Sequence, residues 1–353
     1  MRKKVATPFV LLLAACLLVF GPLLGMSEAQ KPTIKVGWIT GTPATALLVG
    51  KEKGFFESPD FRVELIEFVG GGKILQALAA REIQFGGAAP IPYLYYLSRR
   101  QDIIIVASLF ETGTVRFLSS GWVQSDEILA SGFVIVRGDS PIRSVKDLKG
   151  KVVAAGNDLG TWPELYMRKL FKDNGINTVK ETTWTTLGFE LMPGALAKGT
   201  IDAAFIWEPF YTLAKEKYKV RLLLTDVEME KVLTPPVGPS AEGGGNPIYA
   251  HREFLQQNPQ LVIAFLKAYK KAMNWTWRNF EEAKRITAKH AGFSPEISDK
   301  VIVNPGPRDG KFSVAALKRA HTVMLEMGAL KSPIEGYPEK FIDYSFLDAA
   351  KVD

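Results

Sequence analysis

The chain has 353 residues, of which 47% are apolar and 23% are charged, and its formal net charge at pH 7 is +7. This composition excludes a disordered chain, and the length suffices for one large or two medium domains. Lys and Arg are spread along the chain without interleaved aromatic residues, so nucleic acid is not an expected partner. A mild positive field would help to gather small anions.

Residues 1–29 are predicted to form a secretory signal peptide. They begin with a basic cluster, continue with a long apolar stretch and end in Ser27-Glu28-Ala29, a small-x-small pattern typical of a cleavage site. Cleavage after Ala29 removes three of the 44 basic and one of the 37 acidic residues, which leaves a net charge of +5. The sequence therefore predicts that the protein is exported.

The single cysteine, Cys16, leaves other modes of export open. It stands in LAAC, the pattern at which bacterial lipoproteins are cut and acylated, so a lipid anchor at Cys16 is an alternative. The following residues stay apolar where a lipoprotein turns polar, and cleavage after Ala29 is the favoured interpretation; an uncleaved membrane anchor is the third. A mature chain that starts after Ala29 has no disulfide and no cysteine-ligated metal.

From Lys31 onward, short apolar runs alternate with helical patterns. The runs IKVGWI, FRVELIEFV, IQFGGA and DIIIVASLF predict strands with helices between them, and FVIVR, KVVAAG and IDAAFIW repeat the alternation after residue 130. Crossover helices let neighbouring strands run in the same direction. We therefore expect an α/β fold with two lobes, each a mainly parallel sheet flanked by helices.

One phrase occurs in both halves of this region. Residues 77–84 read ALAAREIQ and residues 195–202 read ALAKGTID, and in both copies Ile precedes a side chain with a carbonyl oxygen. A proline follows a few positions on, at Pro90 and at Pro209. Chance could produce so short a match, but the repeat also fits two lobes built to one plan.

The later part of the chain completes the predicted domain organisation. Pro and Gly gather at about residues 228–248, which indicates a crossing segment, and long helical patterns follow it. The predicted parts are the signal peptide (1–29), a discontinuous first lobe (33–130 plus 235–330), a second lobe (131–234) and a C-terminal tail that packs on a lobe (331–353).

Signals of catalysis are weak. His251, His290 and His321 do not stand at metal-ligand spacings, and surface or helix-packing roles are the simpler interpretation. The GGGK at 70–73 lacks the first glycine and the Ser or Thr of a phosphate loop, and no Gly-x-Ser-x-Gly elbow is present. We expect no catalytic residue, no metal and no cofactor.

Helix starts placed directly after strands are the best candidates for a binding site. Such turns occur at residues 40–43, 86–90 and 157–164, where Thr161 and Glu164 have the spacing of a capping box. The first turn of a helix has unpaired N–H groups and a partial positive charge, so it can hold an oxyanion. In open α/β sheets these turns lie at the carboxyl ends of the strands, where ligands bind. Simple capping by Gly and Pro is the alternative for each turn.

Tryptophans and carboxylates accompany these turns. Trp38, Trp162 and Trp207 stand at strand ends or helix starts, although core packing is an alternative because Trp is mostly buried. Asp158 and Glu208 could receive an ammonium or ring-amino group, or could be capping carboxylates, and the sequence leaves both open. The predicted ligand-binding residues are Trp38, Thr40, Gly41, Thr42, Gly86, Gly87, Ala88, Pro90, Asp158, Gly160, Thr161, Trp162, Trp207 and Glu208.

Several stretches resemble a known family. Residues 140–154, SPIRSVKDLKGKVVA, closely resemble a signature of the solute-binding proteins of nitrate, sulfonate and taurine type ABC importers. GKEKGFFE (50–57), ALAAREIQFGGAAP and ALAKGTIDAAFIWEPF resemble further phrases of that family in the same order, over roughly residues 33–330. The chain departs from the pattern at Arg81 and Gln84, where the family usually has Gly and Asp, and in residues 115–132.

The resemblance implies a two-lobed periplasmic binding protein of the type II topology whose lobes close on a solute. It implies a non-catalytic, monomeric component of an ABC importer that captures a small anionic organic solute, such as a sulfonate or taurine, for a permease in the inner membrane. It also points to the turns named above as the lining of the cleft. Alternatives are an enzyme on the same fold that acts on a pyrimidine or aromatic precursor, and a ligand-sensing module for a membrane partner.

Overall fold

The computed structural model describes residues 31–39, 44–111, 116–118, 121–123, 132–156, 160–226, 228–229, 245–290, 292–300 and 306–352. All of these except Lys31 belong to one unit, Pro32–Asp353. The predicted signal peptide and Cys16 lie outside the described residues. Of the helices that are described, none is both long enough and apolar enough to span a bilayer.

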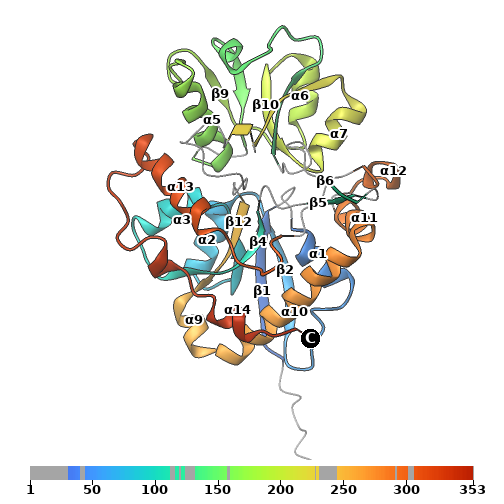
Figure 1. Cartoon of the computed structure of the whole chain (residues 1–353), viewed down its shortest axis with the longest axis vertical. Helices are drawn as coiled ribbons and strands as arrows, with labels where there is room; N and C mark the ends of the chain where they lie inside the picture. The colour runs from blue at the N-terminus through green and yellow to red at the C-terminus, as the bar shows by residue number, and fades with distance from the viewer. Residues whose placement is uncertain are drawn as a thin grey trace, which may run out of the picture. The chain divides into compact units, whose positions relative to one another are not determined.

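The first sheet has five strands in the order β2-β1-β3-β12-β4. Figure 1 labels β1, β2, β4 and β12 of this sheet. Strands β2 and β3 pair with β1 in parallel, whereas β12 is antiparallel to both β3 and β4. Four strands therefore share one direction and β12 opposes them. The strands are β1 (Thr33–Ile39), β2 (Arg62–Phe68), β3 (Phe85–Gly87), β4 (Ile103–Glu111) and β12 (Gly245–His251).

The second sheet repeats this plan in the order β9-β8-β10-β7-β11. Strands β9 and β10 pair with β8 in parallel, and β7 is antiparallel to β10 and β11. The strands are β7 (Gly132–Arg137), β8 (Val152–Ala154), β9 (Thr183–Thr185), β10 (Ala203–Trp207) and β11 (Val220–Thr225), and a separate hairpin joins β5 (Arg116–Leu118) to β6 (Gly121–Val123).

The antiparallel strand of each sheet is the strand that follows a crossing of the chain from the other sheet. The chain passes from the first sheet to the second between β4 and β7, and it returns between β11 and β12. Both β7 and β12 therefore enter their sheets directly after a crossing and run against the other four strands. We call each sheet together with the helices packed on it a lobe. The predicted α/β fold with two mainly parallel sheets is confirmed, while the predicted residue bounds of the lobes stay a prediction.

Helices cover both faces of the first sheet. Ile103 and Ile105 of β4 pack in the core with α2 and α3, whereas Ile104 and Val106 pack on the opposite face with α1 and α10. A strand that is buried on both faces is apolar at every position, which explains the continuous apolar run at this point. The helices of this lobe include α1 (Thr45–Glu52), α2 (Gly71–Ala79), α3 (Pro90–Leu97), α9 (Arg252–Gln257), α10 (Pro259–Arg278) and α11 (Phe280–His290).

The remaining helices complete the second lobe and the C-terminal region. Ile342 in the C-terminal region bridges to Ile105 of β4, so this region reaches the edge of the first sheet. The second lobe contains α5 (Trp162–Asp173), α6 (Met192–Lys198), α7 (Phe210–Lys217) and the 3-10 helix η1 (Val145–Leu148). The C-terminal region contains α12 (Pro295–Ser298), α13 (Val314–Glu326), η2 (Glu339–Phe341) and α14 (Ser345–Ala349).

The repeated phrase marks the same connection in each lobe. It runs from the end of α2 to the residue before β3 in the first lobe, and from the end of α6 to the residue before β10 in the second. The backbone N–H of Gln84 donates to the Lys35 carbonyl (2.9 Å), and the Gln84 Oε1 accepts from the Lys35 N–H (2.8 Å). Asp202 makes the same two bonds with Val152, at 2.8 and 2.9 Å. The prediction of two lobes built to one plan is confirmed.

Candidate functional site

The predicted binding residues that the structure describes lie at or near the carboxyl ends of parallel strands. Gly86 and Gly87 belong to β3, and Ala88 and Pro90 lead into α3. Gly160, Thr161 and Trp162 form the start of α5, while Trp207 ends β10 and Glu208 follows it. Thr40, Gly41, Thr42 and Asp158 lie outside the described residues, so their placement is not addressed.

The start of α3 has the features of an anion site. Ala89 is the N-cap and makes no side-chain cap bond, Pro90 takes the first helical position, and the first turn has no acidic residue. The positive end of this helix is therefore not neutralised by a carboxylate of its own first turn. Binding of an anion at this turn stays a prediction.

Gly86 and Gly87 have a structural explanation. A Cβ atom on Gly86 would lie 2.3 Å from Ile74 Cγ2, and one on Gly87 would lie 2.6 Å from Leu109 Cδ2. Both distances are far below a normal contact, so close packing of β3 accounts for the two glycines. Contact of either glycine with a ligand stays a prediction.

The start of α5 differs from the predicted capping box. Thr161 is the N-cap, but its hydroxyl donates to the Ala155 carbonyl (3.2 Å) and makes no cap bond. Glu164 Oε2 instead accepts from the backbone N–H of Gly160 (2.5 Å), one residue before the N-cap. Gly160 adopts a φ of +76°, and in this turn its N–H, rather than that of Thr161, bonds Glu164. The predicted pairing is wrong, and a buried carboxylate already lies at this helix start.

Trp162 and Trp207 belong to an aromatic cluster, which we define as Phe110, Trp162, Tyr166, Phe205 and Trp207. The ring centroids of Trp162 and Trp207 lie 5.9 Å apart, and Trp207 also meets Phe205 at 4.8 Å in an edge-to-face arrangement. Phe110, at the end of β4, lies 6.5 Å from Trp207. The aromatic cluster therefore reaches from the first sheet to the second. Trp162, at the start of α5, and Trp207, at the end of β10, are both buried.

Trp38 does not take part in these ring contacts. It is partly buried and packs against two groups of core residues that include Leu48 and Val49 of α1 and Ala272 of α10. This position joins β1 to its covering helices, as the core-packing alternative predicts. Its contact with a ligand stays a prediction.

Glu208 is buried at the start of α7. Its Oε2 accepts from the Thr212 N–H (3.1 Å) and its Oε1 accepts from the Thr212 hydroxyl (3.0 Å). These bonds satisfy an N–H group in the first turn of α7, which fits the capping alternative. The second alternative, a partner for an ammonium group, stays a prediction.

Two residues between the lobes were not among the predicted set. Tyr95 of α3 places Cε2 3.4 Å from the point where a Cβ on Gly160 would lie, so the second half of α3 approaches the start of α5. Burial and the negative charge of Glu164 raise the pKa of Tyr95, which favours its neutral hydroxyl. Phe110 ends an apolar run and could have been found from that position, whereas no sequence signal distinguishes Tyr95 from its neighbours.

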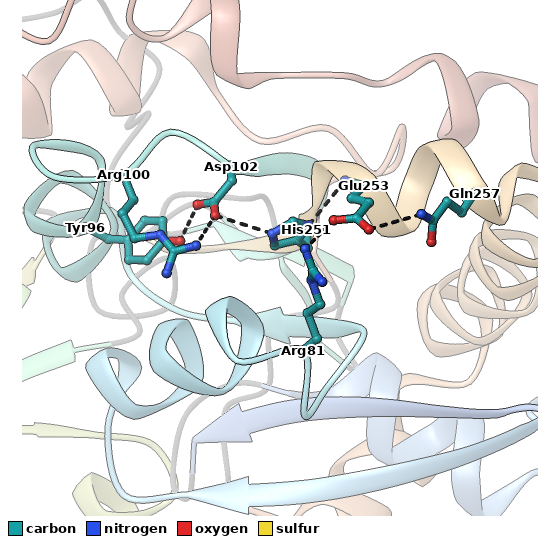
Figure 2. A network of polar contacts seen from close by, with 7 residues as sticks. All are labelled: Arg81, Tyr96, Arg100, Asp102, His251, Glu253 and Gln257. Carbon is teal, nitrogen blue, oxygen red and sulfur yellow. Dashed lines mark hydrogen bonds and ion pairs between the residues drawn. The ribbon is translucent and has the colours of Figure 1, made fainter.

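The histidine with the most elaborate surroundings lies away from these turns. His251 ends β12, and its Nδ1 accepts from the Glu253 N–H (3.2 Å) at the start of α9 (Figure 2). Its Nε2 lies 3.4 Å from Asp102, which also accepts from Tyr96 and Arg100. Burial acts to raise the pKa of Asp102, but these two bonds outweigh it and lower the pKa. His251 is thus a helix cap, as its simpler interpretation predicts.

The described residues contain no group of three or more His, Cys, Asp or Glu side chains that could hold a metal. The pockets formed by described residues alone include one lined by Arg81, Gln84, His251, Glu253 and Gln257 and others beside α2 and α11, rather than at the turns named above. The features that point to a ligand are therefore the aromatic cluster and the start of α3, which has no side-chain cap and no acidic residue in its first turn.

Two sheets of this topology, joined by two crossings, define the fold of periplasmic binding proteins. The aliphatic sulphonate binding protein SsuA of Escherichia coli has this fold, with a TM-score of 0.65 and 19% identity over 88% of this chain and 92% of its own. The nitrate-binding protein NrtA of Synechocystis PCC 6803 gives a TM-score of 0.62 and 15% identity, covering 90% of this chain and 86% of its own.

The sequence comparisons identify the family. The model of the NMT1-like family matches residues 27–292, so the chain belongs to the NMT1-like family. A putative aliphatic sulfonates-binding protein of Bacillus subtilis is 25% identical over 265 residues, which cover 74% of this chain and 71% of that protein. The resemblance to the solute-binding proteins of nitrate, sulfonate and taurine type importers is confirmed.

Proposed function

We propose that this protein is the periplasmic solute-binding component of an ABC importer and that it holds a small anionic organic solute between its two lobes. The observation that carries the proposal is the aromatic cluster, which extends from Phe110 of the first sheet to Trp207 of the second and includes Trp162 at the start of α5. Relatives named for binding aliphatic sulfonates and nitrate support an anionic ligand.

The two helix starts suggest how the solute is oriented. The first turn of α3 has no acidic residue, whereas Glu164 lies at the start of α5. A helix N-terminus attracts an anion through its N–H groups and its partial positive charge, and a nearby carboxylate opposes this. Pro90 and Pro92 have no N–H, so at α3 the attraction comes from the partial positive charge and the N–H of Ile91. We therefore place the anionic group at α3 and the organic part against the aromatic cluster.

The lining of this site remains the predicted set. From the described residues it comprises Trp38, the turn from Gly86 to Pro90, the turn from Gly160 to Trp162, Trp207 and Glu208, to which we add Tyr95 and Phe110. We propose that Thr40, Gly41, Thr42 and Asp158 also line the site. Aromatic surface is of little use for a bare inorganic ion, so an organic anion is favoured over nitrate.

The proposal includes no catalysis, and its further partners follow from the class of protein. The similar proteins are named as binding proteins for aliphatic sulfonates or nitrate. We propose that this protein is a monomer, exported by a signal peptide, that delivers its solute to a permease in the inner membrane. An enzyme on this fold and a sensor module remain the alternatives.

A ligand panel tests the proposed function. Residues 30–353 are purified, freed of bound ligand by unfolding and refolding, and heated with aliphatic sulfonates, taurine, nitrate, aromatic carboxylates or pyrimidines. A ligand at about 100 times its dissociation constant adds about 2.7 kcal/mol of stability. We expect a rise in melting temperature with one class of organic anion, and turnover of that ligand would favour the enzyme instead.

A matched pair of variants locates the site. Trp207→Phe replaces the two-ring indole by a single ring and so removes aromatic surface from the cluster. We expect it to weaken binding about ten-fold. Trp184→Phe is the control, because Trp184 lies on β9 and packs against Phe171 and Arg168, outside the cluster. Equal affinities of both variants and the parent protein would contradict the site, and a folded protein that responds to none of the classes would contradict the proposed function.

A further inference from the structure

The C-terminal region contacts the second lobe at two separate places. Helix α12 packs against α7, and α13 packs against both α3 of the first lobe and α5 of the second (Figure 1). These contacts are additional to the two covalent crossings between the sheets. They are non-covalent, so any motion that separates the lobes has to break them or turn about them.

The first contact joins the α12 segment to α7. Lys300 Nζ lies 2.6 Å from Glu216 Oε2, and Phe293 meets Phe210 with ring centroids 6.0 Å apart. The Thr212 hydroxyl lies 3.5 Å from the Lys300 carbonyl oxygen. An ion pair, an aromatic contact and a polar contact thus connect this segment to one helix of the second lobe.

The second contact joins the end of α13 to α5. Lys169 Nζ lies 2.6 Å from Asp173 on its own helix and 3.4 Å from Glu326 Oε2 on α13. Lys172 Nζ donates to the backbone carbonyl of Glu326 (3.4 Å). The side chain of Lys169 is only 11% exposed, so solvent screens this charge less than that of a typical surface lysine.

We propose that α12 and α13 form a two-point clasp that holds the second lobe against the first and sets the rate at which solute is released. The inference rests on the proposed function, because release matters only if a solute is bound between the lobes. Its physical basis is that ion pairs of this kind are individually weak and reversible, so they can bias an equilibrium between lobe arrangements without locking it.

Charge reversal tests the clasp without any solute. The chain after the predicted cleavage site has no cysteine, so Lys180→Cys in the second lobe and Lys267→Cys on α10 provide two unique, exposed positions for spin labels. In this background, Glu326→Lys faces Lys169 and Lys172. We expect the population with a longer label-to-label distance to rise about two- to five-fold. Lys169→Glu in addition to Glu326→Lys should return the distribution part of the way to that of the parent, because Asp173 and Lys172 stay in place.

The second contact point and a control use the same readout. Glu216→Lys should raise the longer-distance population by a similar factor, with rescue by Lys300→Glu. Glu339→Lys is the matched control, because its pair with Lys318 joins two parts of the C-terminal region and does not reach the second lobe. Thermal unfolding of each variant shows that it is folded.

The outcomes separate the clasp from the proposed function. Distances that respond to Glu326→Lys and Glu216→Lys, with rescue and with an unchanged control, support the clasp. Unchanged distances in both variants overturn the clasp, even if solute binding is demonstrated. The lobes would then turn about these contacts without breaking them, and the contacts would not hold the lobes together. Once a solute is known, the same variants should release it about two- to five-fold faster; unchanged release also overturns the proposal.

Discussion

The connection from α2 to β3 in the first lobe and the connection from α6 to β10 in the second have the same left-handed backbone conformation, but different residues adopt it. Arg81 follows α2 with a φ of +61°, and Gly199 follows α6 with a φ of +73°. Glycine adopts this conformation freely, whereas other residues are strained in it. The Arg81 side chain pairs with Glu253, so an ion pair offsets part of this strain. Both connections therefore require a positive φ at this position, whether the residue is glycine or arginine.

The helix starts between the lobes show the opposite case, in which a difference of residues changes what the lobe can bind. The start of α3 has no acidic residue in its first turn, whereas Glu164 lies at the start of α5. The first lobe is thus the better site for an anionic group, and the second contributes most rings of the aromatic cluster. Four pairs of variants test this comparison, in order of expected effect.

The largest effect is expected from the aromatic cluster. Trp207→Ala removes a nearly buried ring with three aromatic neighbours, and it should lower the free energy of unfolding by about 3–5 kcal/mol. Trp184→Ala, on the partly buried edge strand β9, should cost clearly less. Urea unfolding measures both, and an equal loss would show that the cluster does not join the lobes.

Packing of β3 should give the next effect. Gly86→Ala forces a Cβ to within 2.3 Å of Ile74 and should cost about 1–3 kcal/mol. Gly72→Ala on the exposed face of α2 meets nothing within 4 Å, and it should stabilise the protein by about 0.5–1 kcal/mol. If Gly86→Ala proves neutral in thermal and urea unfolding, space for a ligand rather than packing explains the glycine.

The repeated hydrogen bonds should differ in strength. Asp202→Ala removes a charged acceptor from the Val152 N–H and should cost about 1.5–3 kcal/mol, and Gln84→Ala removes a neutral one from the Lys35 N–H and should cost about 0.5–1.5 kcal/mol. Asp202→Asn is the control that keeps the shape. A larger loss at Gln84 in chemical unfolding would contradict the equivalence of the two connections.

The smallest effect concerns the left-handed positions. Gly199→Ala should cost about 1 kcal/mol, because an L side chain is strained at a φ of +73°. Arg81→Gly removes this strain but also the pair with Glu253, so we expect a net gain of about 0.5 kcal/mol or less. Differential scanning calorimetry resolves the sign. A clear loss at Arg81→Gly would mean that the ion pair dominates.

The sequence predicts the lobes well because their strands are apolar on both faces and their helices are amphipathic. It does not predict that β12 enters the first sheet antiparallel between β3 and β4, because that pairing depends on a segment more than 100 residues away. The helix starts were found from Gly and Pro. The capping pair at Glu164 was misassigned, since the accepted N–H comes from Gly160 at positive φ.

The candidate site is predictable only in part. Trp162 and Trp207 were found because they stand at strand and helix ends, but nothing in the sequence separates them from Trp38, which packs between β1 and its helices. Tyr95 was missed because its approach to Gly160 arises only when the two lobes meet. Residue spacing indicates which side chains share an element. The group that each side chain bonds, as at Glu164, and the contacts between the lobes depend on the folded backbone.

The most direct test of the central claim is amide hydrogen exchange with and without the solute that the ligand panel identifies. If the solute lies between the lobes, amides at residues 88–93 of the first lobe and at residues 160–166 and 207–212 of the second should all exchange more slowly when it is bound. Protection confined to one lobe, or to the pocket around His251, would contradict the account.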